Sequence, residues 1–258
     1  MLAAIMSARS LRLRALAVRV VLLLFAAIPA AAQQSTVLLE ELAWTDLRDR
    51  IDAGATTILV PIGGTEQNGP HLALGKHNRR ALALAERIAS RLGNALVAPV
   101  VAYVPEGTID PPTEHMKFPG TITVPEEVFE RGLESAARSF RRHGFRDIVL
   151  LGDHGGYRRS LERVAQRLNR EWPAQVRAHH LEAYYRAAGI HEHGGEADTS
   201  LTLALAPGMV HADRLAQSRR AGSGATGDAS GATAERGHAM AARVVDASVE
   251  AIRKVTRR

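Results

Sequence analysis

Hydrophobic and polar positions along the chain predict helices and short buried strands in alternation. Apolar residues spaced three and four positions apart, often closed by a glycine, predict helices over 38–54, 79–93, 125–144, 157–172, 199–207 and about 233–254. Short apolar runs predict buried strands over 56–63, 95–104 and 146–153, with a further strand inside 175–185. The segment 105–121 is rich in proline and glycine and is predicted as loop, and 221–231 is predicted to be flexible.

Strands that alternate with helices of this length are typical of βαβ units, which build a mostly parallel sheet with helices on both faces. We therefore predict an α/β fold, a three-layer α/β/α sandwich, formed by a single domain over 33–258. The roughly 225 residues of this stretch are enough for one domain with a buried core. No linker that would divide the stretch is visible in its composition.

The first 32 residues have the pattern of a secretory signal peptide. Four arginines precede the apolar run 20–32, which ends in Ala30-x-Ala32, a pattern that signal peptidase accepts. The run is shorter than the roughly 20 apolar residues of a membrane span. We expect an exported protein, periplasmic or secreted, with no stable membrane anchor once the signal is cleaved. An uncleaved anchor is the alternative.

Charge and cysteine content narrow the chemistry. The formal net charge of +6 includes the four signal arginines, so the rest of the chain has 29 basic against 27 acidic residues. With so small an excess, and without a basic block interleaved with aromatic residues, nucleic acid is not an expected partner. Cysteine is absent, so any metal must be held by His, Asp, Glu or Asn side chains.

Three polar clusters follow predicted strands or lie in long loops, at 64–78, 152–157 and 191–200. In an open α/β sheet the ligand crevice lies at the carboxyl ends of the strands, so these clusters are expected to converge there. Taken alone, Glu66 is typical of a surface loop and His154 of a structural or solvated histidine. The glycines around His154, however, would let a ligand approach closely.

The third cluster gathers imidazoles and carboxylates within eight residues: His191, Glu192, His193, Glu196 and Asp198. A charged surface loop is one interpretation, but these groups together also suit Zn²⁺ or Mn²⁺. The spacing matches no helix-borne zinc motif such as H-E-x-x-H, and the chain has neither a nucleophilic-serine elbow nor a phosphate loop. The shared position of the three clusters therefore favours a metal-dependent site.

Five segments in this order make the chain resemble the creatininase (creatinine amidohydrolase) family: 61-PIGGTEQNGPHLALGKHN-78, 118-FPGT-121, 152-GDHGGY-157, 193-HGGEADTSLTLAL-205 and 233-TAERG-237. The resemblance runs through most of the chain after the predicted signal. It implies a layered α/β/α fold, hydrolysis of an amide with the help of two divalent ions, Zn²⁺ or Mn²⁺, and assembly as a homohexamer.

The resemblance also implies a set of metal ligands. In the family's first motif a glutamate, a histidine and a bridging aspartate bind metal. Here the glutamate is retained as Glu66, the histidine is replaced by Asn68, and the aspartate is replaced by His77. The next ligand histidine falls on His154, and Gly156 stands where creatininase itself has a further glutamate ligand.

Other roles are implied for the third cluster. The family's proton-carrying histidine falls on His193, and the glutamate that opens its last helix falls on Asp198, which we expect as a further ligand. Asp153 and Glu192 are expected to orient an imidazole by hydrogen bonding, as carboxylates beside metal-bound histidines do.

The departures from the family pattern favour one metal ion over two. An imidazole nitrogen binds a single ion, whereas a carboxylate can bridge two ions about 3.5–4 Å apart, so His77 weakens a two-metal centre. Asn68 offers only a neutral amide oxygen. Three protein ligands and a water make a catalytic zinc site, and Glu66, His77 and His154, with Asp198, would supply them. We predict a mononuclear site, or one strong and one weak site, with zinc preferred over manganese.

The predicted activity is hydrolysis of a C–N amide bond in a small, non-peptide molecule, linear or cyclic. The ion would lower the pKa of a water toward about 7, and His193 would carry the proton to the leaving nitrogen. One alternative is a non-catalytic exported binding protein on the same fold. Another is a metal-dependent enzyme of a different reaction class, such as deformylation or peptide-bond cleavage.

Overall fold

The computed structural model describes residues 36–256, and from Val37 onward they form one compact unit. The predicted signal peptide, residues 1–32, lies outside the described residues. Within the described part of the chain, no helix is long and apolar enough to cross a membrane.

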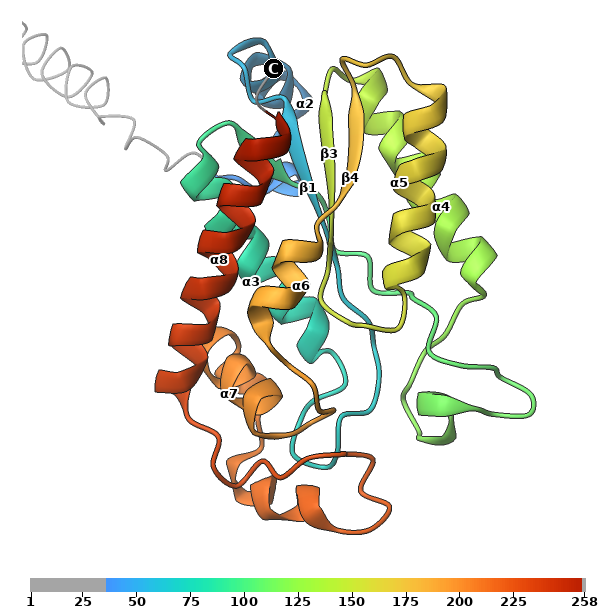
Figure 1. The fold of residues 1–258 in the computed structure, drawn as a ribbon, viewed down its shortest axis with the longest axis vertical. Helices are drawn as coiled ribbons and strands as arrows, with labels where there is room; N and C mark the ends of the chain where they lie inside the picture. The colour runs from blue at the N-terminus through green and yellow to red at the C-terminus, as the bar shows by residue number, and fades with distance from the viewer. Residues whose placement is uncertain (1–35, 257–258) are drawn as a thin grey trace, which may run out of the picture. The chain divides into compact units, whose positions relative to one another are not determined.

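The described residues build a parallel sheet of four strands in the order β2-β1-β3-β4 (Figure 1). These strands are β1 (Thr57–Ile62), β2 (Ala95–Val97), β3 (Asp147–Gly152) and β4 (Arg177–His180). Strands β1 and β3 pair along their whole length. Every residue of both is buried, which is why each is a continuous apolar run rather than an alternating one.

Alternate residues of the central strands face two separate cores. Ile58, Val60 and Ile62 of β1 belong to one core, whereas Leu59, between them, belongs to the other. This alternation is the period of a β-strand, and it requires a helical layer on each face of the sheet.

Both layers are present (Figure 1). One core is completed by α2 (Trp44–Asp52), α4 (Glu126–Arg142) and α5 (Arg158–Glu171). The other is completed by α3 (Lys76–Leu92), α6 (Glu182–Ala188), α7 (Glu196–Leu205) and α8 (Ala234–Thr256). The predicted three-layer α/β/α fold with a parallel sheet is thereby confirmed.

Several boundaries differ from the prediction. Helix α3 begins at Lys76 rather than at residue 79, so His77 lies in a helix and not in the preceding loop. The predicted strand over 95–104 ends at Val97; Pro99 two residues later has no N–H to donate to a neighbouring strand. The segment 38–54 is a short 3₁₀ helix, η1 (Leu39–Glu41), followed by α2.

Short helices also interrupt segments that were predicted as strand or loop. The stretch 175–185 contains β4 and then the start of α6. The predicted loop 105–121 contains a 3₁₀ helix, η2 (Glu114–Lys117). Two further 3₁₀ helices, η3 (Pro207–Met209) and η4 (Ala212–Arg219), follow α7.

The contact between α7 and α8 yields a stability prediction. A Cβ at Gly237 of α8 would collide with the carbonyl oxygen of Ser200 in α7. Gly237→Ala is therefore expected to lower the free energy of unfolding by about 1–3 kcal/mol, as overpacking does. The matched control is Gly132→Ala in α4, where a Cβ meets nothing within 4 Å and should stabilise by up to about 1 kcal/mol. Urea unfolding of both variants measures the difference; equal effects would contradict the close packing of α7 on α8.

Candidate metal centre

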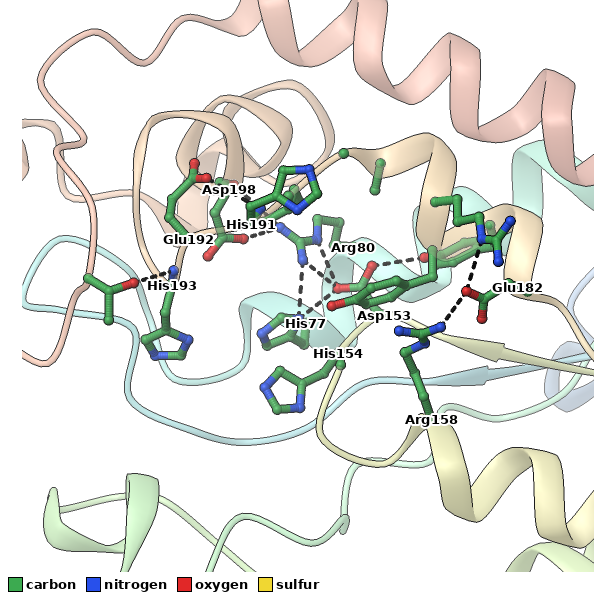
Figure 2. A pocket seen from close by; sticks show the side chains of 18 of the residues that line it. His77, Arg80, Asp153, His154, Arg158, Glu182, His191, Glu192, His193 and Asp198 are labelled. Atoms are coloured by element: carbon green, nitrogen blue, oxygen red, sulfur yellow. Dashed lines mark hydrogen bonds and ion pairs between the residues drawn. The ribbon is translucent and has the colours of Figure 1, made fainter.

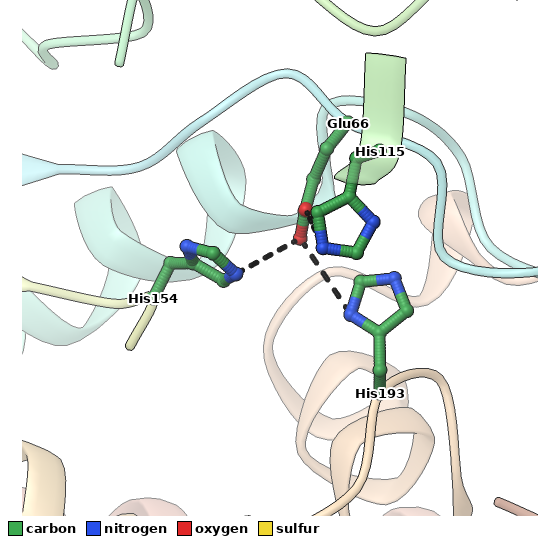
Figure 3. Close-up of side chains that lie close together, drawn as sticks. All are labelled: Glu66, His115, His154 and His193. Carbon is green, nitrogen blue, oxygen red and sulfur yellow. Dashed lines mark ion pairs between the residues drawn. The ribbon is translucent and has the colours of Figure 1, made fainter. Parts of the chain in front are cut away.

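A glutamate and three histidines converge at the carboxyl edge of the sheet (Figure 3). One ligand atom from each lies within 4.8 Å of the others: Glu66, His115, His154 and His193. Glu66 follows β1, His154 follows β3, His115 comes from η2, and His193 directly precedes α7. The sheet therefore places the first two, and the loops bring the other two to them.

Distances in the cluster fit one divalent ion. From Glu66, Oε2 is 3.1 Å from His115 Nε2, while Oε1 is 3.6 Å from His154 Nε2 and 3.9 Å from His193 Nδ1. Donor atoms held about 2.1 Å from a tetrahedral zinc ion lie about 3.4 Å from one another. Glu66 is fully buried, and its Oε2 accepts no hydrogen bond from the described residues. One carboxylate with three imidazoles is also a donor set that zinc and manganese accept.

The main chain and side chain of Gln67 orient two of the imidazoles. His193 Nε2 donates to the Gln67 carbonyl oxygen at 2.7 Å, so His193 Nδ1 has a free lone pair that faces Glu66. The Gln67 side-chain amide lies 3.0 Å from His115 Nδ1 and also donates to the Gly224 carbonyl. Because an amide N–H only donates, His115 Nδ1 accepts here, and the N–H of the ring is then on Nε2, 3.1 Å from Glu66 Oε2. Binding an ion through Nε2 requires that proton to leave this nitrogen. Gln67 therefore holds both rings toward the same point.

Burial and mutual charge shift the pKa values of this cluster. Burial alone would raise the pKa of Glu66, but the neighbouring His154 and His77 outweigh it and lower that pKa below its usual range. Burial lowers the pKa of His154 to about 4 and that of His193 to about 4, although the Glu66 carboxylate opposes both shifts. At neutral pH, His154 and His193 are therefore neutral and have a lone pair to offer, as metal ligands and proton acceptors must.

His77 contacts the cluster but has no free nitrogen. Its Nε2 lies 2.8 Å from Glu66 Oε1, and its Nδ1 lies 2.7 Å from Asp153 Oδ2. Asp153 also accepts hydrogen bonds from Arg80 Nε and the Tyr184 hydroxyl, each at 2.8 Å. His77 therefore links two buried carboxylates, those of Glu66 and Asp153. Asp153 was predicted to orient the imidazole of a metal ligand; the imidazole that it contacts is that of His77, which has no free nitrogen for a metal.

Asp198 lies away from the cluster, in a buried ion-pair network. Its carboxylate contacts the ammonium group of Lys76 and accepts from Arg80 Nη1 at 2.6 Å. The Gly194 N–H donates to it as well, at 2.9 Å. Burial would raise the pKa of Asp198, but Lys76 and Arg80 hold it well below the usual range. The structure thus gives this carboxylate two cationic partners of its own.

The remaining two predicted residues make main-chain contacts. Asn68 is fully buried, and its amide nitrogen donates to the Glu66 carbonyl oxygen at 3.0 Å, while its Oδ1 accepts no hydrogen bond from the described residues. Glu192 Oε1 accepts the Ala197 N–H at 2.8 Å, in the first turn of α7. Asn68 supports the Glu66 loop, and Glu192 caps a helix.

The cluster opens into a pocket of about 800 Å³. Figure 2 shows His193 on one side of this pocket, Arg158 and Glu182 on the other, and His77 and His154 between them. Arg158 is ion-paired with Glu182 and stacks over the Tyr185 ring at 4.7 Å. The pocket is large enough for a small organic molecule or part of a peptide.

The sequence did not predict two residues of the site, a histidine and a glutamate. His115 was hidden in the segment 105–121, whose proline and glycine content predicted only loop. Glu106, in the same segment, has a buried carboxylate beside His154. Burial and the nearby Glu66 raise the pKa of Glu106 to about 10. The FPGT motif at 118–121 lies directly after His115 and was the one available signal that this loop belongs to the site.

A carboxylate and three imidazoles at the carboxyl edge of a parallel α/β sheet, open to a pocket, are typical of a metal-dependent hydrolase. The chain belongs to the creatininase family, because residues 40–252 match the family model described as creatinine amidohydrolase. The family resemblance seen in the sequence is thereby confirmed.

Relatives within the family act on different molecules. The chain is 31% identical over 229 residues to the mycofactocin precursor peptide peptidase of Mycobacterium ulcerans, covering 78% of this chain and 86% of that protein. It is 28% identical over 203 residues to the creatinine amidohydrolase of Pseudomonas putida, covering 70% and 76%. One relative is thus a peptide peptidase, and the other is a creatinine amidohydrolase.

Solved creatininase structures share the fold. A crystal structure of creatininase superposes with a TM-score of 0.72 at 24% identity, over 87% of this chain and 99% of the other. A structure described as the manganese form of creatininase gives a TM-score of 0.71 at 25% identity, over 86% and 100%.

The Asp198 network yields a second prediction. Asp198→Asn leaves buried Lys76 without its carboxylate partner and Arg80 with Asp153 alone, so unfolding free energy should fall by about 3–5 kcal/mol at neutral pH. Because the folded-state pKa is depressed, this contribution is present above the unfolded pKa of about 3.9 and is lost as pH falls. Denaturation of wild type and variant from pH 7 down to pH 3 should show the gap closing.

The matched control for this prediction is Asp246→Asn, which breaks the exposed pair between Asp246 and Arg91 and should change stability little. Zinc binding separates the two roles of Asp198. If the folded Asp198→Asn protein loses its zinc while its stability is unchanged, Asp198 is a ligand and the network interpretation fails.

Proposed function

We propose that this protein is a metal-dependent amidohydrolase with one divalent ion, held by Glu66, His115 and His154, and with His193 as proton carrier. The observation that carries the proposal is the convergence of three imidazoles on one buried carboxylate at the mouth of a pocket. Membership of an amidohydrolase family supports it. Zinc is the preferred ion for this donor set, and manganese is the alternative.

When bound, the ion would activate a water molecule and polarise the carbonyl of the scissile amide. His193 is suited to proton transfer because its Nε2 is anchored on the Gln67 carbonyl while its neutral Nδ1 faces the reaction site. It would take a proton from the attacking water at Nδ1 and deliver it to the leaving nitrogen. Gln67 would keep the ring in place throughout.

The surroundings of Asn68 and His77 support one ion rather than two. Both His77 nitrogens face carboxylates, and the Asn68 amide nitrogen is bound to the main chain of the Glu66 loop. Neither His77 nitrogen is therefore open to a second ion, and Asn68 offers only a neutral amide oxygen. The predicted ligands His77 and Asp198 are thus replaced in the proposal by His115, a residue that already faces Glu66.

The proposed substrate is a small molecule with an amide bond. A peptide amide is the second candidate, because the relative in Mycobacterium ulcerans is a peptide peptidase. Export through the signal over 1–32 and assembly as a homohexamer are carried forward as predictions; mass spectrometry of the mature N-terminus and light scattering of the purified protein test them.

Metal removal tests the proposed activity. Protein stripped with a chelator should lose hydrolysis of responsive members of a panel of amides, lactams and short peptides, and Zn²⁺ or Mn²⁺ should restore it. Glu66→Gln and His154→Gln should lose both bound metal and turnover. Ligand binding without turnover, unaffected by the chelator, would instead identify a non-catalytic binding protein.

His193 should separate catalysis from metal binding. His193→Gln is expected to retain the ion but to lower kcat by roughly 10²–10⁴-fold, the usual contribution of a general acid–base. The matched control is His143→Gln, at the exposed end of α4, which should retain full activity. Loss of the ion in His193→Gln would show that His193 is a ligand and not the proton carrier.

A further inference from the structure

Glu106 has a buried carboxyl group with no hydrogen-bond partner among the described residues. Its side chain is 1% exposed, and neither carboxylate oxygen accepts a hydrogen bond from the described residues. A buried carboxyl group that makes no hydrogen bond is costly relative to one in water. Natural proteins keep such groups where something else compensates them.

The main chain around Glu106 holds the carboxylate in place. The Glu106 N–H donates to Thr123 Oγ1 at 2.9 Å. A Cβ at Gly64 would lie 3.0 Å from Glu106 Oε1, and Gly64 has a φ of +148°, so only glycine fits well here. The loop after β1 is thus shaped to let the Glu106 carboxylate approach.

His154 lies between Glu106 and the cluster carboxylate. Its Nε2 is 3.6 Å from Glu66 Oε1, and its Nδ1 is 3.8 Å from Glu106 Oε1. A histidine that binds a metal through one nitrogen almost always donates its other N–H to a carboxylate, a carbonyl oxygen or water. Glu106 is in the position of that acceptor.

The buried cations near the cluster already have carboxylate partners. Four buried carboxylates surround the centre, namely Glu66, Glu106, Asp153 and Asp198. The two buried cationic side chains, Lys76 and Arg80, contact only Asp153 and Asp198 among these four. Neither cation contacts Glu66 or Glu106, so these two carboxyl groups lie beside the histidines alone.

We propose that Glu106 is a positioning residue of the metal centre, which accepts the Nδ1–H of His154 and so holds Nε2 toward the ion. The inference rests on the proposed function, because it requires His154 to be a ligand. Glu106 does not line the pocket, so it has no contact with a substrate there. It acts on the ion through His154.

The geometry sets one condition. The 3.8 Å separation of His154 Nδ1 and Glu106 Oε1 must shorten by roughly half an ångström to become a hydrogen bond. At present Nδ1 accepts the Gly156 N–H at 3.2 Å. Gly156 is exposed, so water can replace that contact when the ring moves.

Zinc affinity tests the proposal. Wild type, Glu106→Gln and the control Glu250→Gln, at an exposed position of α8, are stripped of metal and titrated with Zn²⁺ against a chromophoric chelator. Glu106→Gln should bind zinc about 10–100-fold more weakly, the usual effect of removing such a partner, with one ion per chain in all three proteins. The control should match wild type.

A spectroscopic measurement separates positioning from a general structural role. In Co²⁺-loaded protein, the ring N–H of a ligand histidine gives a shifted, exchangeable proton signal. Glu106→Gln should move that signal or speed its exchange, and Glu250→Gln should leave it unchanged. The metal-free Glu106→Gln protein should be about as stable as wild type, because burial and Glu66 raise the pKa of Glu106 to about 10 and the substitution therefore exchanges one neutral polar group for another.

Four outcomes would overturn the proposal. Equal zinc affinity in Glu106→Gln shows that Glu106 does not support His154. A fall from two ions to one, with the tight site unchanged, makes Glu106 a ligand of a second ion. A metal-free Glu106→Gln protein less stable than wild type makes Glu106 a structural residue. If the wild-type protein binds neither Zn²⁺ nor Mn²⁺, the proposed function is wrong as well. In the other three outcomes the wild-type protein still binds metal, so the proposed function stands and only the role of Glu106 is wrong.

Discussion

The neutralisation of carboxylates buried at the carboxyl edge of the sheet is the constraint on which the rest of this structure depends. Charges taken out of water must be paired or must bind a cation. Asp153 and Asp198 meet this requirement with Arg80, and Asp198 also with Lys76. Since Lys76 and Arg80 both lie in the first turns of α3, one helix end neutralises the loop after β3 and the start of α7 together. The same contacts fix where those two segments can lie.

These buried ion pairs explain how loops can hold the side chains of the site in fixed positions. Buried ion pairs contribute little net stability but penalise any arrangement that separates the partners. The Asp153 carboxylate is fixed by Arg80 and by the Tyr184 hydroxyl of α6, and it fixes His77, which in turn contacts Glu66. Glu66 is therefore held from behind by a rigid chain of hydrogen bonds. Its other oxygen, Oε2, accepts no hydrogen bond from the described residues and lies 3.1 Å from His115 Nε2.

Relative to the family pattern, this chain has exchanged metal ligands for hydrogen-bonding groups. An imidazole at position 77 bridges two carboxylates by hydrogen bonds, where the pattern has an aspartate that bridges two metals. The amide of Asn68 supports a main-chain carbonyl. The change from aspartate to histidine at position 77 also removes a carboxylate from this part of the site, whereas the change from histidine to asparagine at position 68 removes none. The fold is unaffected, because none of these residues packs in the two hydrophobic cores.

The sequence by itself determined the layered fold, because continuous apolar strands and one-sided helices can be buried in few other ways. It also indicated Glu66 and His154 as candidate site residues, through their place after central strands and their match to ligand positions of the family that the sequence resembles. Only the tertiary structure decided that His115 and Glu106 join them, because both lie in an irregular segment whose path no periodicity predicts. The same holds for Asp198. A carboxylate near histidines in sequence suggests a metal ligand. In the structure, however, Asp198 pairs with Lys76 and Arg80, which lie more than a hundred residues away in the chain.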